Sequence, residues 1–157
     1  MEKTVSTEIL QLREWVNSAR RIVFFGGAGV STESGIPDFR SVDGLYNQRY
    51  EYPPETILSH SFFCSKPAAF FRFYREKMTF DPKAIRPNAA HLALARLEAE
   101  GKMEGTGIVT QNIDGLHSEA GSRSVFELHG SIHRNYCARC GQFYPLSRIM
   151  ESESDPS

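Results

Sequence analysis

Residues 22–40 read IVFFGGAGVSTESGIPDFR, an apolar run followed by a glycine-rich turn and a polar loop. The run at 22–25 has no polar alternation, which is typical of a short strand in a sheet covered on both faces. Three glycines then allow a sharp turn and let a ligand approach the backbone: Gly26, Gly27 and Gly29. Residues 31–34 are expected to form the first turn of a helix, whose free N–H groups favour phosphate. The stretch therefore predicts a pyrophosphate site after a strand.

This stretch differs from the ordinary dinucleotide fingerprint Gly-x-Gly-x-x-Gly, because Thr32 stands where the third glycine would be. For the glycines alone, a structural turn without a ligand stays open as the alternative. The continuation favours a ligand site, because Pro37 stiffens the loop. Directly after it, Asp38, Phe39 and Arg40 place an acid, a ring and a guanidinium side by side.

Further along the chain, apolar segments alternate with segments of helical pattern. Strands are expected at residues 107–110 and 125–128, and helices at 7–20, 67–80 and 87–101. Strands that alternate with helices indicate an α/β fold with a parallel sheet.

Two of the predicted helices carry apolar surfaces. The helix at 7–20 begins after Ser6 as N-cap and has one apolar face, which consists of Ile9, Leu12, Trp15, Val16 and Ala19. The helix at 67–80 is crowded with aromatic residues, which indicates a core helix, with an acyl-chain channel as the alternative. Residues 41–60 are predicted to form a long loop that covers a ligand.

The composition excludes several classes of protein. A length of 157 residues suits one domain, and 18 basic residues against 19 acidic ones leave no basic field for nucleic acid. No apolar run approaches the ~20 residues that span a bilayer, and the first residues lack a secretion signal. Three cysteines do not make a disulfide scaffold. We therefore expect a cytoplasmic protein with neither a membrane nor a nucleic-acid partner.

Polar side chains follow the other two predicted strands. Residues 110–117 read TQNIDGLH, with Gln111, Asn112 and Asp114 after an apolar strand; the alternatives are a polar pocket and an Asx-turn. His129 follows the last strand, and its pKa range suits a general base, with a structural histidine as the alternative. Three other histidines have no chemical context in the sequence: His60, His91 and His133.

Four segments in this order resemble the sirtuin family of NAD-dependent protein deacylases, of the bacterial type. They are GAGVSTESGIPDFR at 27–40, TQNIDGLH at 110–117, ELHGS at 127–131 and the Cys-x-x-Cys pair at 137–140. The resemblance implies the first part of a Rossmann-like sheet with helices on both faces, a helical insertion and the start of a zinc module. It also implies lysine deacetylation that passes the acyl group to ADP-ribose and releases nicotinamide, with acyl-lysine proteins or peptides as partners.

The resemblance also implies roles for individual residues. His129 is the general base and Asn112 the second catalytic residue, while Asp114 and the Ile113 backbone hold the nicotinamide carboxamide. The residues implied to bind NAD are Gly27, Ala28, Gly29, Ser31, Thr32, Asp38, Phe39, Arg40, Gln111, Asn112, Ile113, Asp114 and His129. His117 is implied to be structural. Family members that favour succinyl groups have a Tyr-x-x-Arg pair where Phe71 and Tyr74 stand here, which implies a preference for neutral acyl groups.

Cys137 and Cys140 are implied to be half of a four-cysteine zinc site, whereas Cys64 is expected to be a buried apolar residue. The implied units are an incomplete NAD-binding domain at 1–131 with an insertion at 41–86, a partial zinc ribbon at 132–150 and a disordered tail at 151–157. The resemblance therefore implies that the chain is cut inside its zinc module. We expect no deacylation by the 157-residue chain on its own. A non-catalytic NAD-binding fragment and a mono-ADP-ribosyltransferase are the alternative functions.

Overall fold

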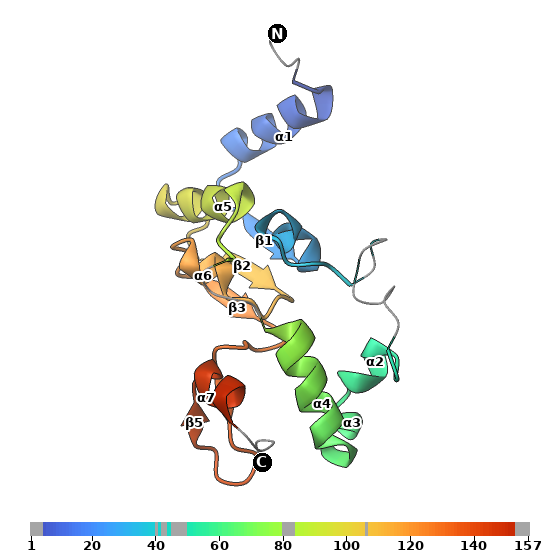
Figure 1. Cartoon of the computed structure of the whole chain (residues 1–157). Coiled ribbons are helices and arrows are strands. Elements are labelled where there is room, and N and C mark those ends of the chain that lie inside the picture. Colours follow the sequence, from blue (N-terminus) through green and yellow to red (C-terminus); the bar gives the residue numbers. More distant parts are fainter. Residues whose placement is uncertain are drawn as a thin grey trace.

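The computed structural model describes residues 5–39, 41, 44, 50–79, 84–105 and 107–152. Its sheet consists of β1 (Val23–Gly26), β2 (Gly107–Thr110) and β3 (Val125–Glu127), with short helices between the first two strands (Figure 1). β2 lies in the middle and pairs in parallel with both neighbours. The predicted α/β fold with a parallel sheet is therefore confirmed.

The two faces of the sheet differ in their cover. Phe24, Ile108 and Val125 share one face through the strand register, and they pack with Leu94 and Met103 in one apolar cluster. This cover comes from α5 (Ala89–Ala99) and the turn that follows it.

The opposite face is open in the described part of the chain. Val23 and Phe25 of β1 are 60% and 63% exposed, and Phe126 and Leu128 are 57% and 55% exposed. The expectation that the first strand is covered on both faces therefore holds for one face only.

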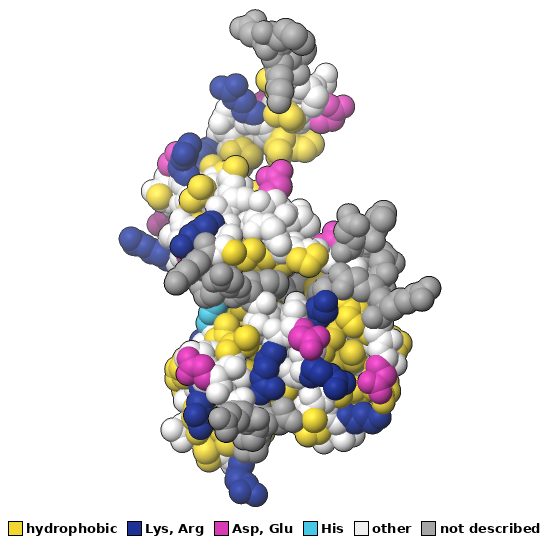
Figure 2. All heavy atoms as spheres, in the orientation of Figure 1, with side chains coloured by type: hydrophobic (Ala, Val, Ile, Leu, Met, Phe, Trp, Pro, Cys, Tyr) yellow, Lys and Arg dark blue, Asp and Glu magenta, His cyan; other side chains and the backbone are white. Residues whose placement is uncertain are grey.

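Helix α1 (Thr7–Ser18) begins at the predicted residue. Ser6 is its N-cap, and the Ser6 side chain accepts a hydrogen bond from the Ile9 N–H. Its apolar face is not packed: Ile9, Leu12 and Trp15 are each more than half exposed. The helix projects from the end of the molecule, and Figure 2 shows hydrophobic side chains open at its surface. The amphipathic pattern therefore predicted the helix correctly, and its apolar face is exposed in the described part of the chain.

A group of short helices lies between β1 and β2 along the chain. It consists of α2 (Pro54–Ile57), α3 (His60–Ser65), α4 (Pro67–Phe73) and the π-helix η3 (Tyr74–Met78). Ile57, Phe62, Phe73 and Met78 form its buried cluster, which confirms the aromatic segment as a core helix. The predicted long loop at 41–60 contains α2, and much of its first half lies outside the described residues.

The C-terminal part is a hairpin followed by a helix. β4 (Asn135–Tyr136) and β5 (Phe143–Tyr144) pair antiparallel, and α7 (Leu146–Glu151) follows. Glu151 and Ser152 are ordered: the Ser152 hydroxyl accepts a hydrogen bond from Arg75 at 3.1 Å. Residues 153–157 lie outside the described residues, so the predicted disorder of the tail stays a prediction. Within the described ranges, no helix is both long and apolar enough to cross a membrane.

Candidate functional site

The candidate site lies at the carboxyl edge of the sheet. The register aligns Gly26, Thr110 and Glu127, so the three following loops leave the sheet at one edge. In open α/β sheets, ligands bind at this edge. The Gln111 N–H donates to the Gly26 carbonyl at 3.0 Å, which fixes the second loop beside the first.

Ser31 is at the centre of this edge and is fully buried. Its hydroxyl donates to Asp114 Oδ2 at 2.8 Å and accepts from Asn112 Nδ2 at 3.0 Å. The second carboxylate oxygen of Asp114 accepts from the Leu116 N–H at 2.9 Å. Three of the residues selected from the sequence thus form one hydrogen-bonded cluster, although Ser31 lies 81 positions from Asn112.

The glycine turn continues into the 3₁₀ helix η1 (Ala28–Ser34), which Gly35 ends in a left-handed conformation at φ 89°. The helix therefore begins three residues earlier than predicted and ends at Ser34, where the sequence predicted the first turn of a longer helix. The Thr32 hydroxyl donates to the Gly29 carbonyl at 3.0 Å.

Two glycines of this turn have different surroundings. A Cβ on Gly27 would lie 3.2 Å from Gln111 Oε1, whereas one on Gly29 would meet nothing within 4 Å. Packing among the described residues therefore does not require glycine at position 29. A phosphate that approaches the backbone closely needs open space of the kind found at Gly29. The turn is therefore compatible with the predicted pyrophosphate site.

The polar loop after η1 is only partly described. Asp38 Oδ1 accepts a hydrogen bond from the Ser41 N–H at 2.8 Å. Phe39 and Ile113 both pack against the aromatic helix cluster, so this apolar wall stands beside the site. Arg40 lies outside the described residues.

His129 is exposed near the start of the third loop, two residues after β3. Its Nδ1 lies 3.1 Å from the Gln111 carbonyl oxygen. His133 makes a similar contact, with Nε2 at 3.1 Å from the Asp114 carbonyl oxygen, and the Ile132 N–H donates to the Ile113 carbonyl. The third loop therefore holds the second loop in place by backbone contacts.

His91, a residue without a predicted role, lies behind Ser31 and is fully buried. Its Nε2 lies 3.5 Å from the Ser31 hydroxyl, and its Nδ1 accepts from the Asn88 N–H at 3.3 Å. The sequence signal at His91 is its spacing from Asn88, Asn-x-x-His, and this spacing indicates a capping box at the start of a helix. Burial lowers the pKa of His91, and the charge of Asp114 opposes this shift to a smaller extent.

His117 lies next to His91, with ring centroids 4.7 Å apart, and packs against Phe24. It is buried, and neither ring nitrogen has a partner within the described part of the chain. The pKa of His117 is lowered to about 4, mainly by burial; the neighbouring His91 contributes to this shift and Asp114 opposes it. Both histidines are therefore neutral near pH 7.

Cys137 and Cys140 lie in the turn between β4 and β5. The Cys137 N–H donates to the Gln142 carbonyl and the Gly141 N–H to the Cys137 carbonyl, both at 2.9 Å, so the turn is closed by its own backbone. Hydrogen bonds from the backbone at Cys140 and Arg139 lower the pKa of the Cys137 thiol. Among the described residues, no third histidine, cysteine or carboxylate joins them as a ligand group. Cys64 is exposed, so its predicted burial was wrong.

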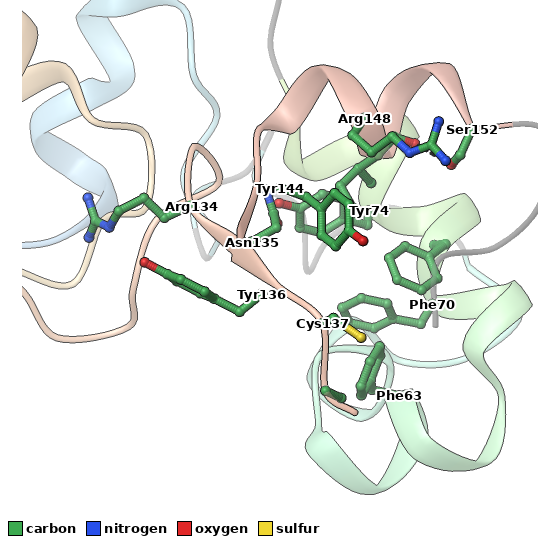
Figure 3. Close-up of a pocket in the computed structure, with 13 residues that line it drawn as sticks. Phe63, Phe70, Tyr74, Arg134, Asn135, Tyr136, Cys137, Tyr144, Arg148 and Ser152 are labelled. Atoms are coloured by element: carbon green, nitrogen blue, oxygen red, sulfur yellow. Dashed lines mark hydrogen bonds between the residues drawn. The ribbon is translucent and has the colours of Figure 1, made fainter. Parts of the chain in front are cut away.

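A cavity of about 470 Å³ separates this hairpin from the aromatic helices. Figure 3 shows the Cys137 side chain beside the rings of Phe63 and Phe70, with Tyr74 and Tyr144 further along the wall. The cavity shares none of its lining residues with the cluster at the sheet edge, so it is a separate feature.

Comparison with known proteins places these features in context. The sequence model of the Sir2 family matches residues 27–157. An NAD-dependent protein deacetylase of Clostridium acetobutylicum is 56% identical over 149 residues, and one of Cutibacterium acnes is 55% identical over 148. The alignments cover 94% and 93% of this chain and 59% of each relative, so the chain spans about three fifths of their length.

Solved structures of the same family are also similar to this chain. One, from work on the mechanism and regulation of Sir2 enzymes, aligns with a TM-score of 0.78 at 42% identity. The alignment covers 94% of this chain and 56% of the solved chain. A structure of Sir2 with a p53 peptide and NAD⁺ has a TM-score of 0.73 at 39% identity, with coverages of 97% and 58%.

Proposed function

The chain belongs to the Sir2 family, and on this premise we propose that it provides the NAD-binding and catalytic segments of an NAD-dependent protein lysine deacetylase. The observation that supports this most is the buried cluster of Ser31, Asn112 and Asp114 at the same sheet edge as His129. The relatives named above carry this activity in their names. Acyl-lysine proteins or peptides are the partners.

The glycine turn binds the pyrophosphate of NAD. Its residues are Gly27, Ala28, Gly29, Ser31 and Thr32. The open space over Gly29 and the short helix that follows support this assignment, because neither the backbone nor a side chain blocks the approach.

The second loop binds the nicotinamide end. When bound, NAD supplies an electrophilic ribose carbon and a leaving group. Asp114 and the Ile113 backbone hold the carboxamide, and Gln111 and Asn112 contact the ribose. Asp38, Phe39 and Arg40 close this end and exclude water, which favours acyl transfer over hydrolysis of NAD.

His129 takes a proton from a ribose hydroxyl through Nε2. Its Nδ1 faces a carbonyl oxygen, which only accepts hydrogen bonds, so the ring proton is on Nδ1 and the lone pair is on Nε2.

Zinc binding is a second part of the proposal. Cys137 and Cys140 provide two thiolates from a turn whose backbone is already closed. A structural zinc site needs four ligands, so the other two come from outside the described residues. Cytoplasmic localisation is also part of the proposal, because a Cys-x-x-Cys pair in a chain with three cysteines is more typical of metal binding in a reducing compartment than of a disulfide framework.

The test uses a chimera of residues 1–157 with the part of the Clostridium acetobutylicum relative that the alignment leaves uncovered. With NAD and an acetyl-lysine peptide, we expect nicotinamide and acetylated ADP-ribose in amounts equal to the deacetylated peptide. The Asn112→Ala chimera serves as the inactive control. A radiolabel from NAD that stays on protein would support mono-ADP-ribosyl transfer instead. NAD binding without turnover would leave only a binding module.

A further inference from the structure

We propose that His91 is a positioning residue, which fixes the Ser31 hydroxyl so that Ser31 in turn orients Asp114 and Asn112 toward the cofactor. The inference rests on the proposed function, because Ser31, Asn112 and Asp114 belong to the proposed NAD site. It concerns a residue 60 positions from Ser31, on a different helix, to which the proposed function assigns no contact with the cofactor.

The first step is the proton position on His91. The backbone N–H of Asn88 points at His91 Nδ1 at 3.3 Å, and an N–H only donates. Nδ1 therefore carries the lone pair, and a neutral imidazole then carries its proton on Nε2. Asn88 itself is fixed, because its side chain accepts from the Ala90 N–H at 2.9 Å and donates to the Val30 carbonyl at 2.7 Å.

The second step is the hydrogen-bond capacity of Ser31. A serine hydroxyl has one proton and two lone pairs. Asn112 Nδ2 at 3.0 Å and His91 Nε2–H at 3.5 Å donate to the two lone pairs. The single proton is then left for Asp114 Oδ2 at 2.8 Å. With His91 in this tautomer, every bonding position of the buried hydroxyl is used and its direction is determined.

The third step is the charge state. The titratable groups that face His91 are Asp114 from the loop after β2 and His117 from α6 (Leu116–Glu119), while η1 contributes only Ser31. His91 is fully buried, which favours its neutral form. A protonated His91 would place a second N–H opposite the Asn88 N–H, so acid would break this arrangement.

A purely structural role is the competing explanation, because His91 also completes the capping box of α5. Two variants separate these roles. In His91→Asn the short side chain still accepts from the Asn88 N–H but does not reach Ser31. In His91→Gln the amide nitrogen reaches Ser31 and the acceptor at the Nδ1 position is lost.

The first measurement uses the 157-residue chain and does not involve NAD. Nitrogen-15 NMR of the imidazoles distinguishes protonated from unprotonated ring nitrogens. We expect His91 to show a protonated Nε2 and an unprotonated Nδ1 between pH 7 and pH 8, where its lowered pKa leaves the ring neutral. A protonated Nδ1 in this range would overturn the proposal, whatever the activity of the chain.

The second measurement uses the chimera described above. We expect His91→Asn to raise KM for NAD about 10-fold with the peptide KM unchanged, and His91→Gln to restore it to within about 3-fold. Urea stability should follow the opposite order, because His91→Gln loses the cap. If NAD affinity follows urea stability, the role is structural. If no variant binds NAD but the tautomer is as expected, the proposed function fails and the proton assignment stands.

Discussion

The Nδ1 atom of His129 lies 3.1 Å from the backbone carbonyl oxygen of Gln111. The Gln111 N–H is in turn bonded to the carbonyl of Gly26 at the end of β1. The tautomer of an exposed imidazole is thus set by the backbone at the carboxyl edge of the sheet. This relationship gives His129 a free Nε2 lone pair without a carboxylate partner.

The first prediction concerns this base. In the chimera, His129→Ala should lower kcat for deacetylation by ~10²-fold or more, the usual scale for a lost general base. NAD affinity should change little, since the ring makes one contact to the second loop. His60→Ala is the matched control, because His60 lies on α3 away from the sheet edge. Near-normal turnover of His129→Ala would falsify the assignment.

The strands and the glycine turn could be predicted from the sequence because their signals are local. Uninterrupted apolar runs give the strands, and Gly27 and Gly29 give the turn. The polar groups after β2 and His129 after β3 could be predicted to meet, because parallel strands end at one edge.

The role of His91 could not be predicted, because its spacing from Asn88 already satisfies a helix cap. Only the fold brings that cap against Ser31. The exposure of the apolar face of α1 could not be predicted either. Periodicity shows which face of a helix is apolar, and it does not show which element covers that face.

The second prediction concerns acyl preference. Phe71 is buried and Tyr74 is partly buried, Arg72 pairs with Glu51 at the surface, and the Arg75 guanidinium donates to the Ile149 carbonyl. Arg75 is held at α7, and Arg72 points to the surface, so we expect neither arginine to face the acyl chain. In the chimera, kcat/KM for succinyl-lysine peptides should be ~10-fold or more below that for acetyl-lysine peptides.

A double variant tests the same assignment in the opposite direction. Phe71→Tyr with Tyr74→Arg introduces the Tyr-x-x-Arg pair and should increase the relative use of succinyl-lysine. Equal efficiency on both peptides before substitution would contradict the prediction.

The third prediction concerns acid stability. Burial lowers the pKa of His117 to about 4 from 6.5, so below pH 6.5 the unfolded chain binds a proton that the folded chain does not. Stability is therefore complete above pH 6.5 and falls as the pH falls toward 4, by on the order of 3 kcal/mol. Urea unfolding of His117→Leu should show a smaller loss over this range.

Two controls refine this measurement. His60→Leu should keep the full acid dependence, because that ring lies on exposed α3. Some dependence should remain in His117→Leu, since the pKa of His91 is lowered as well. An unchanged pH dependence in His117→Leu would contradict the prediction.

The fourth prediction concerns zinc. Cys137 and Cys140 supply two ligands, and the described residues offer no third one beside them. The 157-residue chain should hold zinc weakly, or at about one ion per two chains if cysteine pairs from two chains combine. Metal analysis after gel filtration measures this ratio. Cys137→Ser should abolish binding and Cys64→Ser should not, whereas one tightly held zinc in a monomer would contradict the prediction.

The last prediction concerns the open face of the sheet. Phe25 and Phe126 both register with Val109, so they flank it in one row across three strands, and both are more than half exposed. A contiguous apolar surface of this kind promotes association, and free strand edges on either side add unpaired backbone groups. The 157-residue chain should therefore self-associate, measured by analytical ultracentrifugation, and Phe25→Thr with Phe126→Thr should shift it toward monomer.

The matched control is Leu92→Thr, which removes an exposed apolar side chain from α5 and should leave association unchanged. Trp15→Thr tests the other exposed apolar surface, on α1. Association that persists in the double sheet variant and disappears in Trp15→Thr would place the contact on α1 instead. If the unsubstituted chain is a monodisperse monomer, the prediction is contradicted and neither apolar surface drives association.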